Sequence, residues 1–164
     1  MHDLISAIRS LVDRYPNRNV SEATVLGYVE DLEDLPEPLV VAAIAKLRKT
    51  STFLPTIAEI RGLVIEAVCG LPTESQAWQQ VRQAMSQPVN SGPWDVHPLV
   101  LAAVREVGTW ELRNDDNGKA ADRFRKVYRE KRTELVHNMQ AGIVPLPQIG
   151  PGHDAVIGLK ALAD

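Results

Sequence analysis

The stretch TSTFLPTIAEIRGLVIEAV, residues 50–68, decides the fold class of this chain. Thr56 and Glu59 have the spacing of a capping box, in which two side chains satisfy the free amides at the start of a helix. Apolar residues then recur at helical spacing, and Gly70 is placed to end the helix. The stretch therefore predicts a loop over 50–55 that leads directly into an amphipathic helix.

Helical patterns of the same kind fill most of the chain. Ser21 is an N-cap candidate, and Thr73 with Gln76 forms a second capping box. No β-pattern of useful length appears in the sequence. We expect an all-α fold, a compact bundle of about six to seven helices with a Pro/Gly-rich C-terminal tail. The expected helical segments are 3–15, 21–35, 36–49, 56–68, 73–85, 98–107 and 119–138, with one further turn at 110–112.

The connector QPVNSGP, residues 87–93, is the clearest internal boundary because it is polar and contains Pro and Gly. We expect an N-terminal helical domain over 1–70 and a second helical region over 71–139. Beyond residue 140, Pro and Gly are too dense for a regular element, so residues 140–164 are expected to form a flexible tail.

Aromatic residues make up only 5% of the chain, so the core must be built mainly from aliphatic side chains. Trp78, Trp94 and Trp110 are expected to be core anchors, with Trp94 half-exposed because it lies in the connector. Phe53 is expected to pack the 50–55 loop. The alternative for the tryptophans is an exposed interface anchor.

Composition and motifs argue against an enzyme. The net charge is −3, and Cys69, the single cysteine, is expected to be a small buried or half-buried thiol. The sequence contains no phosphate-binding loop and no nucleophile elbow, and its four histidines stand far apart. We therefore expect no catalytic residue, no metal and no cofactor. With no signal peptide or membrane span in the sequence, we expect a cytoplasmic protein.

The sharpest charge feature is the segment 119–132, which carries seven Lys/Arg against two acidic residues. Arg125, Arg129 and Arg132 line one flank of the expected helix, beside the face that carries Phe124. Such a stripe could hold phosphates or an acidic partner. The alternative is an amphipathic surface helix with basic side chains that extend into solvent.

Two further surface features are candidates for contacts with a partner. An acidic cluster at the end of the second expected helix is either a solvated surface or a patch for a basic partner. Its members are Glu30, Asp31, Glu33, Asp34 and Glu37. The tail ends in a short apolar segment that either docks back on the core or binds a partner protein. The candidate partner-binding residues there are Val156, Ile157, Leu159, Lys160 and Leu162.

The first 68 residues resemble a known family. The run Phe53-Leu54-Pro55-Thr56-Ile57-Ala58-Glu59-Ile60, preceded by Leu35-Pro36-Glu37 and by VAAIAKL at 41–47, is similar to the N-terminal domain of phage proteins that load and inhibit the replicative hexameric helicase. The likeness covers roughly residues 3–68. A weaker likeness to the second half of phage replication proteins covers Trp78 to Tyr128.

The resemblance implies a replication accessory protein in the cytoplasm of a bacterial host. Such a protein binds the replicative hexameric helicase, inhibits it and delivers it to the origin complex, with an origin-binding initiator as a further partner. The family's contact element is its C-terminal part, which corresponds here to 140–164, although the long middle section of this chain leaves it open which part touches the helicase. The alternative is a helical DNA-binding regulator or packaging adaptor that uses the basic segment 119–132.

Overall fold

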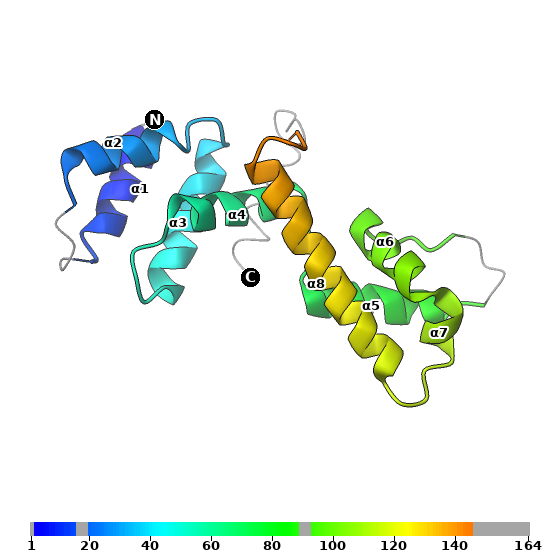
Figure 1. Cartoon of the computed structure of the whole chain (residues 1–164). Coiled ribbons are helices and arrows are strands. Elements are labelled where there is room, and N and C mark those ends of the chain that lie inside the picture. The colour runs from blue at the N-terminus through cyan, green and yellow to red at the C-terminus, as the bar shows by residue number, and fades with distance from the viewer. Residues whose placement is uncertain (1, 16–19, 89–92, 146–164) are drawn as a thin grey trace. The chain divides into compact units, whose positions relative to one another are not determined.

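The computed structural model describes residues 2–15, 20–88 and 93–145, and this part of the chain is all-α (Figure 1). Eight helices are present among these residues and no strand. They are α1 (His2–Val12), α2 (Glu22–Glu30), α3 (Glu37–Thr50), α4 (Ile57–Val68), α5 (Glu74–Met85), α6 (Pro98–Val107), α7 (Thr109–Arg113) and α8 (Lys119–Gln140). Each expected segment contains a helix, and the single turn expected at 110–112 is the short helix α7. The second segment is shorter than expected, because the chain turns over residues 31–34 and α2 ends at Glu30.

The helices form two compact units. Residues up to Gly70 and the described residues from Asn138 onward make the first unit, and Leu71–His137 make the second. The boundary lies at the turn between α4 and α5, where Gly70 has a φ of 58°. Because only Gly adopts this backbone conformation freely, Gly70 ends α4 as the sequence predicted. The connector at 87–93 lies within the second unit.

The first unit is built by α1 to α4, with α3 packed against both α1 and α4. Its core is aliphatic, as the scarcity of aromatic residues predicted. The fully buried members include Ile8, Leu11, Leu32, Leu39, Val40, Ile60 and Val64. Burial of these side chains is the main stabilising contribution to this unit, at about 1.5–3 kcal/mol for each large one.

Polar contacts fix how the helices of the first unit meet. The guanidinium of Arg61 on α4 binds both carboxylate oxygens of Asp34, at 2.6 and 2.7 Å, and donates to the carbonyl of Asp31 at 2.6 Å. The backbone amide of Leu4 donates to the Glu37 carboxylate at 3.1 Å. The hydrogen bond and charge of Arg61 lower the pKa of Asp34 below its ordinary value. Two members of the acidic cluster therefore hold helices together.

The second unit is built by α5, α6, α7 and the part of α8 up to His137. Its core is centred on Phe124 and Tyr128, one turn apart on α8 and fully buried. Trp78 packs on Phe124 with a ring-centroid distance of 5.6 Å. The buried hydroxyl of Tyr128 donates to the carbonyl of Pro72 at 2.5 Å. The segment before α5 is thereby attached to the centre of α8.

Cys69 lies in the first unit, half-buried, with its Sγ 3.4 Å from the Sδ of Met139. Burial raises the pKa of this thiol, so it stays protonated and of low reactivity at neutral pH. The structure therefore confirms the expected half-buried thiol. Among the described residues, no helix combines the length and the apolar character that a membrane crossing requires.

Candidate partner-binding surface

The loop between α3 and α4, residues 51–56, is held at both ends by side chains from other helices. Its first carbonyl, that of Ser51, accepts a hydrogen bond from the hydroxyl of Tyr15 at 2.9 Å. The carbonyl of Pro55 accepts one from the hydroxyl of Tyr28 at 2.8 Å. Pro55 is buried and Leu54 packs against the core, so the loop backbone is fixed on the first unit.

The capping box predicted at the start of α4 is confirmed. The amide of Glu59 donates to the Thr56 hydroxyl at 3.2 Å, and the amide of Thr56 donates to the Glu59 carboxylate at 2.7 Å. The amides of Thr56 and Glu59 are thereby satisfied where the loop passes into α4. A second capping box, between Thr73 and Gln76, opens α5 in the same way.

Phe53 does not pack the loop, and that expectation is wrong. Its side chain is 76% exposed, although the neighbouring Leu54 and Pro55 turn inward. Because both ends of the loop are attached, the next residues take the inward positions and the Phe53 ring is left outside. The chain has only two phenylalanines, and the exposed one contributes little buried apolar surface to the stability of the first unit.

The end of α3 that leads into Phe53 is basic. The last turns of α3 carry Lys46, Arg48 and Lys49, and the eight residues from Lys46 to Phe53 include no acidic side chain. Lys49 is exposed and lies four residues before Phe53. The carboxylate of Glu59, on the far side of the loop, is engaged in the capping box. An exposed aromatic ring that follows a basic helix end fits an apolar recess with an acidic rim.

The basic segment on α8 is largely paired within the second unit. Arg125 binds Asp122 at 2.8 Å and lies 5.2 Å from the centre of the Trp78 ring. Arg129 binds the Glu74 carboxylate through Nε and Nη2, both at 3.0 Å. The third predicted residue, Arg132, is half-buried with its Nε covered by protein. Carboxylates of the second unit therefore partly neutralise the positive charge of this stripe.

An aromatic ring lies beside this flank. Trp78 reaches Arg125 from α5 and not from α8 itself, so the helical spacing on α8 carried no sign of it. The Trp78 ring is half-buried against Phe124. It therefore serves as packing for the Arg125 side chain and not as a free surface for stacking a base.

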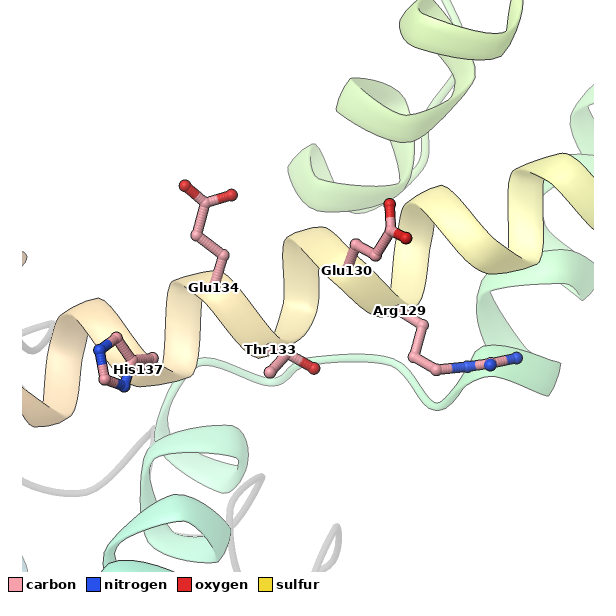
Figure 2. Close-up of a pocket in the computed structure, with 5 residues that line it drawn as sticks. All are labelled: Arg129, Glu130, Thr133, Glu134 and His137. Carbon is pink, nitrogen blue, oxygen red and sulfur yellow. The ribbon is translucent and has the colours of Figure 1, made fainter.

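A shallow pocket runs along α8, lined by Arg129, Glu130, Thr133, Glu134 and His137 (Figure 2). Figure 2 shows that the carboxylate of Glu134 points away from the His137 ring. The guanidinium of Arg129 is engaged with Glu74. These groups do not converge on one point, so the pocket does not place an acid and a base around a substrate.

The remaining predictions concern the apolar tail segment, metal binding and the acidic cluster. The apolar tail residues Val156, Ile157, Leu159, Lys160 and Leu162 lie outside the described residues. Within the described ranges, no three His, Cys, Asp or Glu side chains gather where they could hold a metal ion. Of the acidic cluster, Glu30 and Glu33 are exposed. The sequence offered no sign that the loop before α4 would present Phe53, because exposure depends on which neighbours turn inward.

Comparisons with protein-family models, with curated proteins and with solved structures return no match. The likeness of residues 3–68 to the phage helicase loaders therefore stays a prediction from the sequence motif.

Proposed function

We propose that this protein is a phage or prophage replication accessory factor that binds the replicative hexameric helicase, inhibits it and delivers it to the origin complex. The observation that supports the proposal most directly is the exposed Phe53 ring on its attached loop. This loop belongs to the run Phe53–Ile60, the most specific part of the resemblance. An exposed aromatic side chain on a held loop suits a protein partner, because little backbone conformational entropy is lost when it binds.

The Phe53 loop is a second candidate contact for the helicase beside the tail at 155–162. The family resemblance favours the tail, and the exposure of Phe53 favours the first helical unit. Basic residues at the end of α3 favour a partner surface that is acidic around an apolar recess.

The alternative function, DNA binding through the basic helix, is less well supported. Arg125 and Arg129 already bind carboxylates of their own unit, at 2.8 and 3.0 Å. Contact with phosphates would require Arg125 and Arg129 to give up those ion pairs. Among its described residues, α8 has few other cations that could bind phosphates and displace counterions from DNA. The test below therefore includes duplex DNA.

Co-sedimentation with the cognate hexameric helicase in the presence of ATP tests the proposal. The proteins to compare are the full chain, Phe53→Ala, Thr52→Ala and a chain that ends at Pro145. The cut is made at Pro145 because Met139 is buried and Gln140 donates to the carbonyl of Ala58 at 2.8 Å. Thr52→Ala is the matched control, since Thr52 is exposed and adjacent to Phe53.

We expect the full chain and Thr52→Ala to bind the helicase and lower its ATPase activity, and Phe53→Ala to bind about 30-fold more weakly. Loss of binding in the shortened chain alone would place the contact in the tail and remove Phe53 from it. If no variant binds helicase and the full chain binds duplex DNA in a salt-sensitive manner, the helicase proposal is wrong.

A further inference from the structure

Trp110 is the second large aromatic side chain that the structure leaves in solvent. It lies on the short helix α7 and is 75% exposed, whereas Trp78 and Trp94 are half-buried and pack against the core of the second unit. The expectation that all three tryptophans are core anchors is therefore wrong for Trp110. Its exposure is as large as that of Phe53 in the first unit.

The backbone that carries Trp110 is fixed on both sides. Gly108, with a φ of 102°, makes the turn that separates α7 from α6. Two residues after Trp110, Leu112 is buried in the core. Arg113 donates to the carbonyls of Met85 at 2.9 Å and Gln87 at 3.4 Å.

The neighbouring side chains strengthen this attachment. Arg113 also lies 5.8 Å from the centre of the Trp94 ring, which packs it against the second unit. Glu111 binds Arg123 on α8 at 3.2 Å. Asn114 donates from its backbone and its side chain to the Trp110 carbonyl, at 3.1 and 2.8 Å. The indole is thus presented by a rigid segment and not by a loose one.

The segment that carries Trp110 is acidic, opposite in sign to the segment that leads into Phe53. Residues 109–118 contain three acidic side chains and a single basic one, Arg113, whose guanidinium donates to backbone carbonyls; one of the three acids, Glu111, is paired with Arg123. Backbone hydrogen bonds, that of the Ala121 amide first, lower the pKa of Asp115, so this carboxylate is charged at neutral pH. Asp116 next to it is exposed. A phosphate chain would be repelled here, whereas basic protein groups would be attracted.

We propose that Trp110 is a second protein-binding anchor, which enters an apolar recess bordered by Lys or Arg side chains on the helicase. This contact depends on the helicase binding proposed above and is separate from Phe53. The two anchors lie in different compact units and favour partner surfaces of opposite charge. One molecule therefore engages two different surfaces of the helicase ring, and simultaneous binding raises the overall affinity above that of either contact.

The experiment is a binding titration of the full chain with the hexameric helicase in the presence of ATP. The variants are Trp110→Ala, Trp110→Phe, Asp116→Lys and the matched control Thr109→Ala, an exposed neighbour. For this measurement the tryptophans of the protein are replaced by 5-hydroxytryptophan, which is excited at a wavelength where the tryptophans of the helicase do not absorb. Acrylamide quenching then reports how accessible the Trp110 ring is, and Trp110→Phe identifies its signal.

We expect the helicase to shield the Trp110 ring from acrylamide and Trp110→Ala to weaken binding about 30-fold. Asp116→Lys should weaken binding about threefold at low salt, and Thr109→Ala should leave it unchanged. Phe53→Ala and Trp110→Ala combined should give the product of the two single losses, because the two rings belong to different compact units.

Three outcomes overturn this inference. A complex with normal affinity for Trp110→Ala and an unshielded ring removes Trp110 from the contact and leaves the helicase function standing. Shielding by single-stranded dT20 but not by helicase makes Trp110 a nucleic-acid contact. If no variant binds helicase, both the proposed function and this contact are wrong. Circular dichroism checks that Trp110→Ala is folded.

Discussion

The loop that carries Phe53 and the short helix that carries Trp110 both have a firmly held backbone, but different interactions hold it. In the first unit, two tyrosine hydroxyls hold the loop by its carbonyls at Ser51 and Pro55. In the second unit, a guanidinium holds α7 to the end of α5, and a glycine makes the turn before it. Both units thus fix the backbone and leave the ring outside.

The comparison teaches that exposure of an aromatic residue is decided by its neighbours and not by its own type. Phe124 and Phe53 have the same side chain, yet the first is fully buried and the second is 76% exposed. Phe124 lies on the inner face of a long helix, one turn from Tyr128. Phe53 lies in a loop whose two following residues already take the inward positions.

The largest expected effect is the difference in stability between alanine substitutions at the two phenylalanines. Phe124→Ala leaves a cavity in the core and should lower the free energy of unfolding of the second unit by about 3–5 kcal/mol. Phe53→Ala should change the free energy of unfolding of the first unit by less than about 0.5 kcal/mol. Urea unfolding measures both, with tryptophan fluorescence for the second unit, which holds all three tryptophans, and circular dichroism for the whole chain. A large loss of stability in Phe53→Ala would mean that the ring packs on the first unit after all.

The next effect concerns the turn before Trp110. Gly108→Ala should destabilise the second unit by about 1–3 kcal/mol, because a φ of 102° is strained for any residue with a Cβ. The added Cβ itself would meet Glu111 only at ordinary contact distance, 3.7 Å, so the cost is in the backbone. The matched control is Gly27→Ala, within α2, where nothing lies within 4 Å of the added Cβ and stability should rise by about 0.5–1 kcal/mol. Equal effects of the two substitutions would contradict the assignment of strain to Gly108.

A smaller effect should follow from loosening the Phe53 loop. Tyr28→Phe removes the hydrogen bond to the carbonyl of Pro55 and should lower the free energy of unfolding of the first unit by about 1 kcal/mol. Helicase binding should weaken as well, because the freed loop must be ordered again on binding. Amide hydrogen exchange over residues 50–56 checks the loop directly. Unchanged exchange would show that the Tyr28 hydroxyl does not hold it.

The smallest effect is a pH dependence of the stability of the first unit. Because Arg61 lowers the pKa of Asp34, this carboxylate adds stability above its unfolded pKa, and the contribution is lost as the pH falls through the lower folded pKa. The gain is less than about 1 kcal/mol, since the Asp34 side chain is half-exposed. Asp34→Asn should flatten the acid limb of the unfolding curve measured by circular dichroism. An identical acid limb in the variant would show that the ion pair does not contribute.

Helix positions were the part of the fold that could be predicted from local sequence. Both capping boxes, the Ser21 cap and the glycine that ends α4 are confirmed. These signals work because a cap and its helix lie within four residues of each other, so tertiary packing has little to add. The candidate site was predicted less well. The tail lies outside the described residues, Phe53 was expected to pack its loop, and an exposed tryptophan was only the alternative.

The sequence by itself determined that the chain is helical, where most of its helices begin, and that the core of the first unit is aliphatic, because these properties depend on spacing and composition. Only the tertiary structure decided that Phe53 and Trp110 face solvent and that Arg129 is paired with Glu74. Those outcomes depend on residues brought from a distance, such as Tyr28 for the Pro55 carbonyl and Glu74 for Arg129. The physical reason is that a side chain's exposure and charge pairing are properties of the packed neighbourhood, which no local spacing specifies.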